Sequence, residues 1–248
     1  MQPRTHAPRD TFDEKLDGIL QRTQYHRVET DADRETIYRL RYDAYWREKT
    51  IWERADARFT DDYDKDENAF VFGVTIDGAL AGSIRLHVVS PLCRRGPAVD
   101  TYGDILGPLL DGGETFVDPS RFVTNPLVRP GAKLLPFAVT RLACMAAEHF
   151  ATDWMLATVR LEHAAFYRRF CSLKPLTAPR TYPCLMKPLM LLGERNEDIR
   201  ESVFTRYPVF SSTLAERLAL FEAADERSSS LEARPVNDNR SIRGEEIA

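Results

Sequence analysis

Two arginines stand inside apolar segments of the sequence and are the first candidates for chemistry. Arg85 lies within ALAGSIRLHVV, and Arg121 lies within TFVDPSRFV. Both segments have the apolar, β-branched character of strands. An unpaired charge in a packed strand costs free energy, so each arginine predicts a carboxylate partner. The alternative is that each arginine faces solvent, where it needs no partner.

Aspartates near these strands are possible partners. Asp61 and Asp64 form a D-x-x-D pair before the segment that holds Arg85, and Asp118 lies in the second strand itself. The loop around the D-x-x-D pair resembles a calcium-binding loop, but Glu67 occupies the position where the sharp turn of such a loop needs glycine. The four cysteines have no C-x-x-C spacing, which argues against zinc. We therefore predict no metal site.

The strands that carry these residues are predicted to form a hairpin and an irregular neighbour. The runs AFVFGVTI and ALAGSIRLHVV are joined by Asp77-Gly78, a pair typical of a type I′ turn. Pro119 interrupts the run TFVDPSRFV. Because proline cannot donate a ladder hydrogen bond, this strand is predicted to bulge or splay there. The run WMLATVR is almost continuously apolar, as in a strand buried on both faces.

Helices are predicted between and after these strands. A helix from Ala132 to about Phe150 and a second one over EHAAFYRRF flank WMLATVR, and TYPCLMKPLM is predicted as the last strand. Capping boxes begin further helices at Thr11 and Thr213. The Pro-, Gly- and Arg-rich stretch from residue 90 to about residue 113 is predicted as a loop. This order of elements predicts a mixed sheet with helices on both faces.

The domain organisation is predicted from composition along the chain. We expect a flexible N-terminal arm with a short helix in residues 1–24, one folded domain in residues 25–222, and a disordered polar tail in residues 223–248. The first residues lack the apolar run of a signal peptide, and no window is apolar enough to cross a membrane. A cytoplasmic protein without an integral membrane segment is therefore expected.

The charge distribution bears on possible partners. The formal net charge is only −4, so no global field favours nucleic acid, and no nucleic-acid reading motif is present. Between Arg121 and Arg180, however, nine Lys or Arg residues stand against three acidic ones. Such a segment is either a docking face for a negative partner or a set of ordinary solvated charges.

Taken together, the charged pieces resemble a known set of motifs. The order D-x-x-D before a hairpin, G-x-x-R-L on its second strand and acid-x-S-R-F on the next strand resembles the autoinducer-synthase-like branch of the GNAT acyltransferases. Within that branch the sequence is most similar to the long-chain N-acyl amino acid synthases. The resemblance covers about residues 41–170. It implies a mostly antiparallel GNAT sheet in residues 25–222, with helices on both faces and splayed central strands.

The resemblance also implies a charged cluster at the acceptor side of the cleft. Its members would be the residues that match the motifs, namely Arg41, Asp61, Asp64, Arg85, Asp118 and Arg121. The family usually has glutamate where this chain has Asp118. The shorter side chain would need a bridging water to reach a substrate amine.

Aminolysis of a thioester defines the roles that these residues would play. Asp118 is our candidate for the proton acceptor, with Asp61 and Asp64 as alternatives or as partners of the arginines. A bulged strand offers backbone N–H groups near Phe122 or Val123 for the oxyanion. By resemblance to GNAT enzymes, Tyr167 would protonate the leaving thiolate, although it could equally be a packed aromatic. The acyl chain is expected between the splayed strands, against Phe122, Val123, Leu156, Ala157 and Val159.

The donor is expected to be an acyl carrier protein rather than coenzyme A. GNAT enzymes hold the pyrophosphate of coenzyme A on a glycine-rich loop, but the matching stretch here, RPGAKLLP, has one glycine and two prolines. The resemblance implies acyl carrier protein as donor, and its acidic surface would meet the basic stretch, with Arg129, Lys133, Arg168 and Arg169 as docking residues. No permanently bound cofactor is expected.

The sequence thus predicts an N-acyltransferase that moves an acyl group from acyl carrier protein to the amine of an amino acid. One alternative is an acyl-homoserine-lactone synthase that takes S-adenosylmethionine as acceptor. That family favours a Trp soon after the Arg41 motif, and Trp52 matches this position. The other alternative is a non-catalytic module that binds the acyl carrier and keeps the fold.

Overall fold

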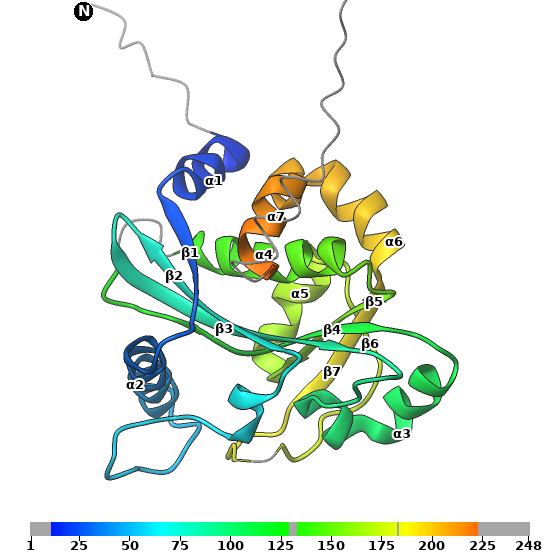
Figure 1. The fold of residues 1–248 in the computed structure, drawn as a ribbon, viewed down its shortest axis with the longest axis horizontal. Helices are drawn as coiled ribbons and strands as arrows, with labels where there is room; N and C mark the ends of the chain where they lie inside the picture. Colours follow the sequence, from blue (N-terminus) through cyan, green and yellow to red (C-terminus); the bar gives the residue numbers. More distant parts are fainter. Residues whose placement is uncertain (1–10, 129–132, 183, 223–248) are drawn as a thin grey trace, which may run out of the picture.

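One seven-stranded sheet runs through the computed structural model, which describes residues 11–128, 133–182 and 184–222 (Figure 1). The strand order is β1-β2-β3-β4-β5-β7-β6. Among the described strands, only β4 and β5 pair in parallel, and every other neighbouring pair is antiparallel. The predicted mixed, mostly antiparallel sheet is therefore confirmed. The strands are β1 Thr23–Arg27, β2 Ala69–Ile76, β3 Ala79–Val89, β4 Phe116–Thr124, β5 Trp154–Val159, β6 Lys174–Pro175 and β7 Met190–Arg195.

Helices cover both faces of the sheet (Figure 1). One face carries α1 (Phe12–Leu20), α4 (Leu135–His149), α5 (Ala164–Phe170) and α7 (Leu214–Phe221), together with α6 (Asn196–Ile199). The other face carries α2 (Asp31–Arg47) and α3 (Pro97–Asp111). Short helical turns complete the described chain: η1 Asp62–Lys65, η2 Leu161–His163, η3 Arg200–Phe204 and η4 Pro208–Phe210. No helix among the described residues is long and apolar enough to cross a membrane.

Each face of the sheet has its own apolar core. On the α4 face, side chains such as Phe72, Leu86 and Leu142 are completely buried. On the α3 face, Tyr102 and Phe116 are completely buried in a second cluster. The strands in the middle of the sheet are thus apolar on both sides, and this explains the near-continuous apolar runs in the sequence.

The hairpin between β2 and β3 is confirmed in detail. Asp77 has φ 50° and Gly78 has φ 77°, so both central residues are left-handed, as a type I′ turn requires. The side chain of Arg22 donates to Asp77 from outside, with its Nε 2.9 Å from Asp77 Oδ1. This turn fixes the register that places Arg85 and His87 on one face of β3.

The predicted loop between residues 90 and 113 is wrong, because this stretch contains α3. Gly96 is the N-cap and Pro97 occupies the first helical turn, where a missing N–H costs nothing. Buried residues then recur at every fourth position, namely Ala98, Tyr102, Leu106 and Leu110. The glycines and prolines between them hide this stripe in the sequence. The last strand is also displaced, since β7 begins at Met190, where TYPCLMKPLM ends.

The N-terminal helix packs onto the sheet–helix core. Thr11 and Glu14 form the predicted capping box of α1. Leu16 is 1% exposed, and Phe12 packs edge-on against Phe137 of α4 at a ring separation of 5.0 Å. The rest of the predicted arm, residues 1–10, and the predicted tail, residues 223–248, lie outside the described residues.

Candidate functional site

Five charged side chains meet on the sheet face that carries α2, and we call them the buried charge cluster. They are Arg41, Asp61, Asp64, Arg85 and Arg121, and none of these side chains is more than 15% exposed. Arg41 comes from α2, Arg85 from β3 and Arg121 from β4, while the two aspartates flank or occupy η1. Residues far apart in the sequence are therefore joined by ion pairs within one layer of the fold.

The pairing within the buried charge cluster follows the sequence prediction for the arginines. Arg41 Nη1 donates to both oxygens of Asp64, at 2.7 and 2.8 Å. Arg85 Nη1 donates to Asp64 Oδ1 at 3.1 Å and also to Asp61, while Arg121 Nη2 donates to Asp61. Arg85 Nε reaches Ser120 Oγ at 3.0 Å. The alternative in which these arginines face solvent is wrong.

The buried charge cluster holds three cations and two anions. Burial alone would raise the pKa of Asp61, but the charges of Arg121 and Arg85 outweigh it, so this pKa lies well below its usual range. The pKa of Asp64 is also lowered, because Arg41 and Arg85 outweigh the effect of its burial. Both carboxylates are therefore ionised at neutral pH and are weak proton acceptors.

A bulge in β4 places Arg121 at the edge of this cluster. Ser83 of β3 is opposite Val123, and Arg85 is opposite Ser120, so two residues of β4 face one residue of β3. Arg121 is left-handed within the bulge, with φ 51°. Pro119 itself pairs in register with Leu86. The bulge residue Arg121 therefore lies two residues after the proline, where the sequence predicted the interruption. A Cβ atom on Gly82 would lie 2.8 Å from the carbonyl oxygen of Val123, and this explains the glycine of the G-x-x-R-L motif.

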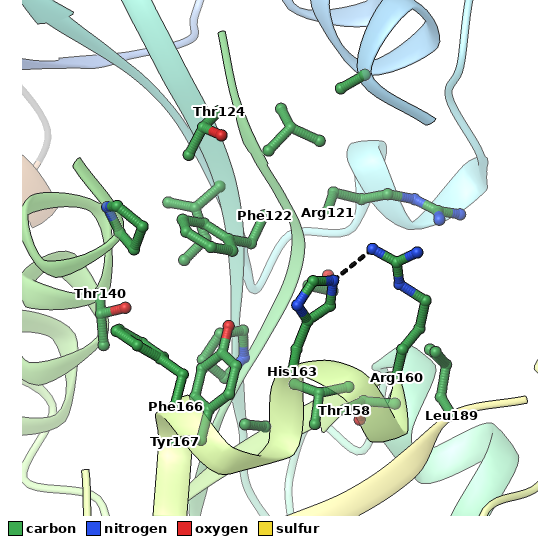
Figure 2. A pocket seen from close by; sticks show the side chains of 18 of the residues that line it. Arg121, Phe122, Thr124, Thr140, Thr158, Arg160, His163, Phe166, Tyr167 and Leu189 are labelled. Carbon is green, nitrogen blue, oxygen red and sulfur yellow. Dashed lines mark hydrogen bonds between the residues drawn. The ribbon is translucent and has the colours of Figure 1, made fainter. Parts of the chain in front are cut away.

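A cavity of about 530 Å³ lies where β4 and β5 separate (Figure 2). The two strands pair only at Phe116 with Trp154 and at Val117 with Met155, and they diverge beyond these residues. Side chains of α2 line the cavity from one face of the sheet, and side chains of α4 and α5 line it from the other. The cavity therefore passes through the sheet, as the prediction of splayed central strands requires.

All five residues predicted for the acyl slot line this cavity. They are Phe122, Val123, Leu156, Ala157 and Val159, and Arg121 joins them from the buried charge cluster. Tyr167 of α5 also lines the cavity, with its hydroxyl directed towards β4 (Figure 2). Burial raises the pKa of Tyr167 far above its usual value, so the phenol stays protonated and can donate a hydrogen bond.

Asp118 lies on the α3 side of β4 and is absent from the lining of the cavity. Its Oδ2 accepts the backbone N–H of Ala98 at 3.0 Å, while its Oδ1 has no hydrogen-bond partner among the described residues. Burial raises the pKa of Asp118 to about 6, although the N–H of Ala98 and the charge of Arg85 oppose the rise. Asp118 is thus more basic than Asp61 or Asp64.

His87 is a polar neighbour that the sequence prediction missed. It is opposite Asp118 in the register of β3 and β4, and its side chain is completely buried. Its Nε2 lies 3.4 Å from Asp66 Oδ2, and burial lowers its pKa to about 4. The signal was present in the sequence, because His87 follows Arg85 by two residues and so shares its face of the strand.

The residues predicted to dock the donor lie apart from the buried charge cluster. Lys133, just before α4, is exposed, as are Arg168 and Arg169 of α5. Arg129 lies outside the described residues. Trp52, which would favour a lactone synthase, is 65% exposed and does not line the cavity. Within the described parts of the chain, no group of three His, Cys, Asp or Glu residues is placed to hold a metal ion.

Comparisons with known proteins agree with this geometry. The family model described as N-acyl amino acid synthase FeeM matches residues 36–194. The structure of FeeM from uncultured soil microbes is similar, with 15% identity, a TM-score of 0.60, and coverage of 74% of this chain and 96% of that one. No curated protein matches the sequence.

Two acyl-homoserine-lactone synthases also share the fold. LasI has 14% identity and a TM-score of 0.54, covering 74% of this chain and 94% of its own. The CoA-dependent synthase BjaI, solved with SAM and isopentyl-CoA, has 16% identity and a TM-score of 0.52, covering 75% of this chain and 89% of its own. Because the FeeM family model spans more than half of the sequence, the chain belongs to the FeeM family of N-acyl amino acid synthases and is a GNAT-type N-acyltransferase.

Proposed function

We propose that this enzyme transfers a long-chain acyl group from the thioester of an acyl carrier protein to the amine of an amino acid. The main supporting observation is the cavity through the sheet, which meets Arg121 on the α2 side and uncharged side chains of α4 and α5 on the other. An apolar chain fits the α4 side, and a charged acceptor fits the α2 side.

The proposed reaction begins with a neutral amine. The amine nitrogen attacks the thioester carbon, a C–N bond forms, and the carbonyl oxygen becomes negative. A backbone N–H at the β4 bulge, near Phe122 or Val123, would donate to this oxyanion. Collapse of the intermediate breaks the C–S bond, and the products are an amide and the free thiol of the carrier.

Two protons must move in this reaction. Asp118 would accept the proton of the amine through a bridging water, since its raised pKa of about 6 makes it a better base than Asp61 or Asp64. Ser120 supports this route, because it follows Asp118 by two residues on the same face of β4 and lines the cavity. Tyr167 would protonate the departing thiolate.

The acyl slot can be tested by filling it. Ala143 of α4 lines the cavity and is 2% exposed. We expect Ala143→Leu to shift the preferred acyl chain to one shorter by a few carbons, because the added methyl groups occupy the space of the chain. Turnover with a series of saturated acyl thioesters measures this shift.

A matched control for Ala143→Leu lies one turn further along α4. Ala147 is 6% exposed and packs in the same core without lining the cavity. Ala147→Leu also adds volume to the core, at a cost of about 1–3 kcal/mol, but it should leave the chain-length preference unchanged. Equal preferences in wild type and Ala143→Leu would place the acyl chain elsewhere.

The donor can be tested by supplying one acyl group on two carriers. We expect kcat/KM to be higher for the acyl carrier protein thioester than for the coenzyme A thioester. The double variant Arg168→Ala, Arg169→Ala should raise KM for the acyl carrier protein thioester. It should leave KM for an acyl-pantetheine thioester unchanged, because in this proposal the two arginines contact the surface of the carrier protein and not the pantetheine arm. Arg39→Ala with Arg94→Ala, at exposed arginines elsewhere, is the control. A preference for coenzyme A would contradict the proposed donor.

A further inference from the structure

The α2 end of the cavity carries charged side chains in addition to Arg121 of the buried charge cluster. The charged side chains that line the cavity are Arg47, Glu48, Arg121, Arg160 and Lys187, and none of the lining residues from α4 or α5 is charged. Three carboxylates contact these cations: Glu48 and Glu162 pair with Arg160, Glu162 also pairs with Lys187, and Asp61 pairs with Arg121. Four cations therefore stand against three anions, which leaves an excess of one positive charge at the end where the acceptor would enter. A site of this charge favours an anionic group on the acceptor.

Arg160 occupies a defined place at this end. It directly follows β5. Side chains two residues apart in a strand lie on the same face, so Arg160 shares the face of Thr158 and Leu156. Leu156 packs in the core on the α3 face, and the side chain of Arg160 therefore emerges on the face that carries α2 and α3. The side chain is 15% exposed. It contacts Glu48 and His163, and its Nη1 lies 3.3 Å from Glu162.

The guanidinium groups of Arg160 and Arg121 extend to the same end of the cavity from the two diverging strands (Figure 2). Arg121 is anchored by Asp61, and its guanidinium carbon lies 4.4 Å from the centre of the Phe59 ring. Each arginine is thus held by protein contacts while it lines the cavity. Two fixed guanidinium groups on opposite walls suit a carboxylate, which can accept from both.

The other arginines of the buried charge cluster are less suitable for this task. Arg41 and Arg85 are 0% and 1% exposed, donate to Asp64, and do not line the cavity. In contrast, Thr158 lines the cavity close to Arg160, and its buried Oγ1 has no hydrogen-bond partner among the described residues. A buried hydroxyl without a partner indicates a ligand or water that completes it.

We propose that Arg160, together with Arg121, binds the α-carboxylate of the acceptor amino acid. This inference rests on the proposed function and deepens it, because it names the group that distinguishes an amino acid from a simple amine. The carboxylate lies one carbon from the reacting nitrogen. Its binding between β4 and the end of β5 therefore directs that nitrogen towards the bulge of β4. Arg160 is a specificity-determining residue, and the proton transfers remain with Asp118 and Tyr167.

The test compares each amino acid with the amine that lacks its carboxylate, such as L-phenylalanine and 2-phenylethylamine. With wild type and a fixed acyl thioester, we expect kcat/KM to favour the amino acid. In Arg160→Met this preference should fall about 10- to 100-fold, as expected for the loss of a charged hydrogen bond. The fall should come from KM for the amino acid, while kcat/KM for the amine and KM for the acyl donor stay unchanged.

Two further variants make the result decisive. Arg200→Met removes an exposed arginine that pairs with Glu148 on the opposite sheet face, and it should leave the preference unchanged. Arg160→Lys keeps the positive charge but lacks the planar guanidinium group, so it should give an intermediate preference for the amino acid. If Arg160→Met does not fold, Arg160→Lys tests whether Arg160 binds the carboxylate. An unchanged preference in a folded Arg160 variant overturns this inference. Failure of wild type to acylate any amino acid overturns the proposed function instead, so the two failures are distinguishable.

Discussion

Asp118→Asn is expected to lower kcat by about 100- to 10,000-fold, the usual range for the loss of a general base. The amide has nearly the same shape as the carboxylate and can still accept the N–H of Ala98, so the fold should persist. It cannot take a proton from the amine at neutral pH. KM for both substrates should change little, because Asp118 does not line the cavity. Steady-state kinetics at saturating acyl donor measures the effect.

The pH profile separates this role from a structural one. The pKa of Asp118 is raised to about 6, and only its ionised form accepts a proton, so wild-type kcat should rise as the pH increases through about 6. This rising limb should be absent from the residual activity of Asp118→Asn. Asp153→Asn, at a carboxylate beside the start of β5 that accepts from Thr115, should keep the limb. If Asp118→Asn kept wild-type turnover and the same rise of kcat through about pH 6, Asp118 would not be the proton acceptor.

Asp64→Asn is expected to give the largest loss of stability, about 3–5 kcal/mol in the free energy of unfolding. Asp64 is the carboxylate that pairs with Arg41, and both side chains are essentially buried, at 1% and 0% exposure. An arginine cannot lose its charge in a protein, so the variant leaves a buried cation without a counter-charge. Urea denaturation measures the change. Asp104→Asn, which breaks the exposed pair with Arg180, should change the free energy of unfolding far less.

Coupling and pH dependence provide the checks on this prediction. Adding Arg41→Met to Asp64→Asn removes the orphaned cation, so the double variant should be more stable than the sum of the single effects predicts. The folded pKa of Asp64 lies below its usual value. Its contribution is therefore present above about pH 4 and is lost as the pH falls through the folded value. Strict additivity of the two substitutions would mean that the Arg41–Asp64 pair contributes nothing.

The sheet and most of its connections could be predicted from the sequence because their signals are local. Asp77-Gly78 fixes one turn, and the capping boxes at Thr11 and Thr213 begin two helices as predicted. Helix α3 is not predicted from the sequence, because residues such as Gly103, Gly107 and Pro108 are typical of loops. The free energy gained by burying Ala98, Tyr102, Leu106 and Leu110 along one face outweighs the low helix propensity of these glycines and this proline.

The sequence predicts which charged residues belong to the site better than it predicts which of them form ion pairs. Arginines in apolar strands correctly predicted carboxylate partners, but which aspartate meets which arginine depends on the path of η1. Asp61 is shared by Arg85 and Arg121, whereas Asp64 is shared by Arg41 and Arg85. The separation of β4 from β5 is a tertiary feature, and it brings Arg160 to the cavity although no motif marks that residue.

Mass spectrometry of lipid extracts tests most directly whether this chain makes N-acyl amino acids. Cells that overproduce the wild-type chain would be compared with cells that make Arg121→Ala, a variant that alters both the buried charge cluster and the cavity wall. We predict new N-acyl amino acids with wild type and their loss with the variant at equal soluble protein. Acyl-homoserine lactones in their place, or no new lipid from well-folded protein, would contradict the claim.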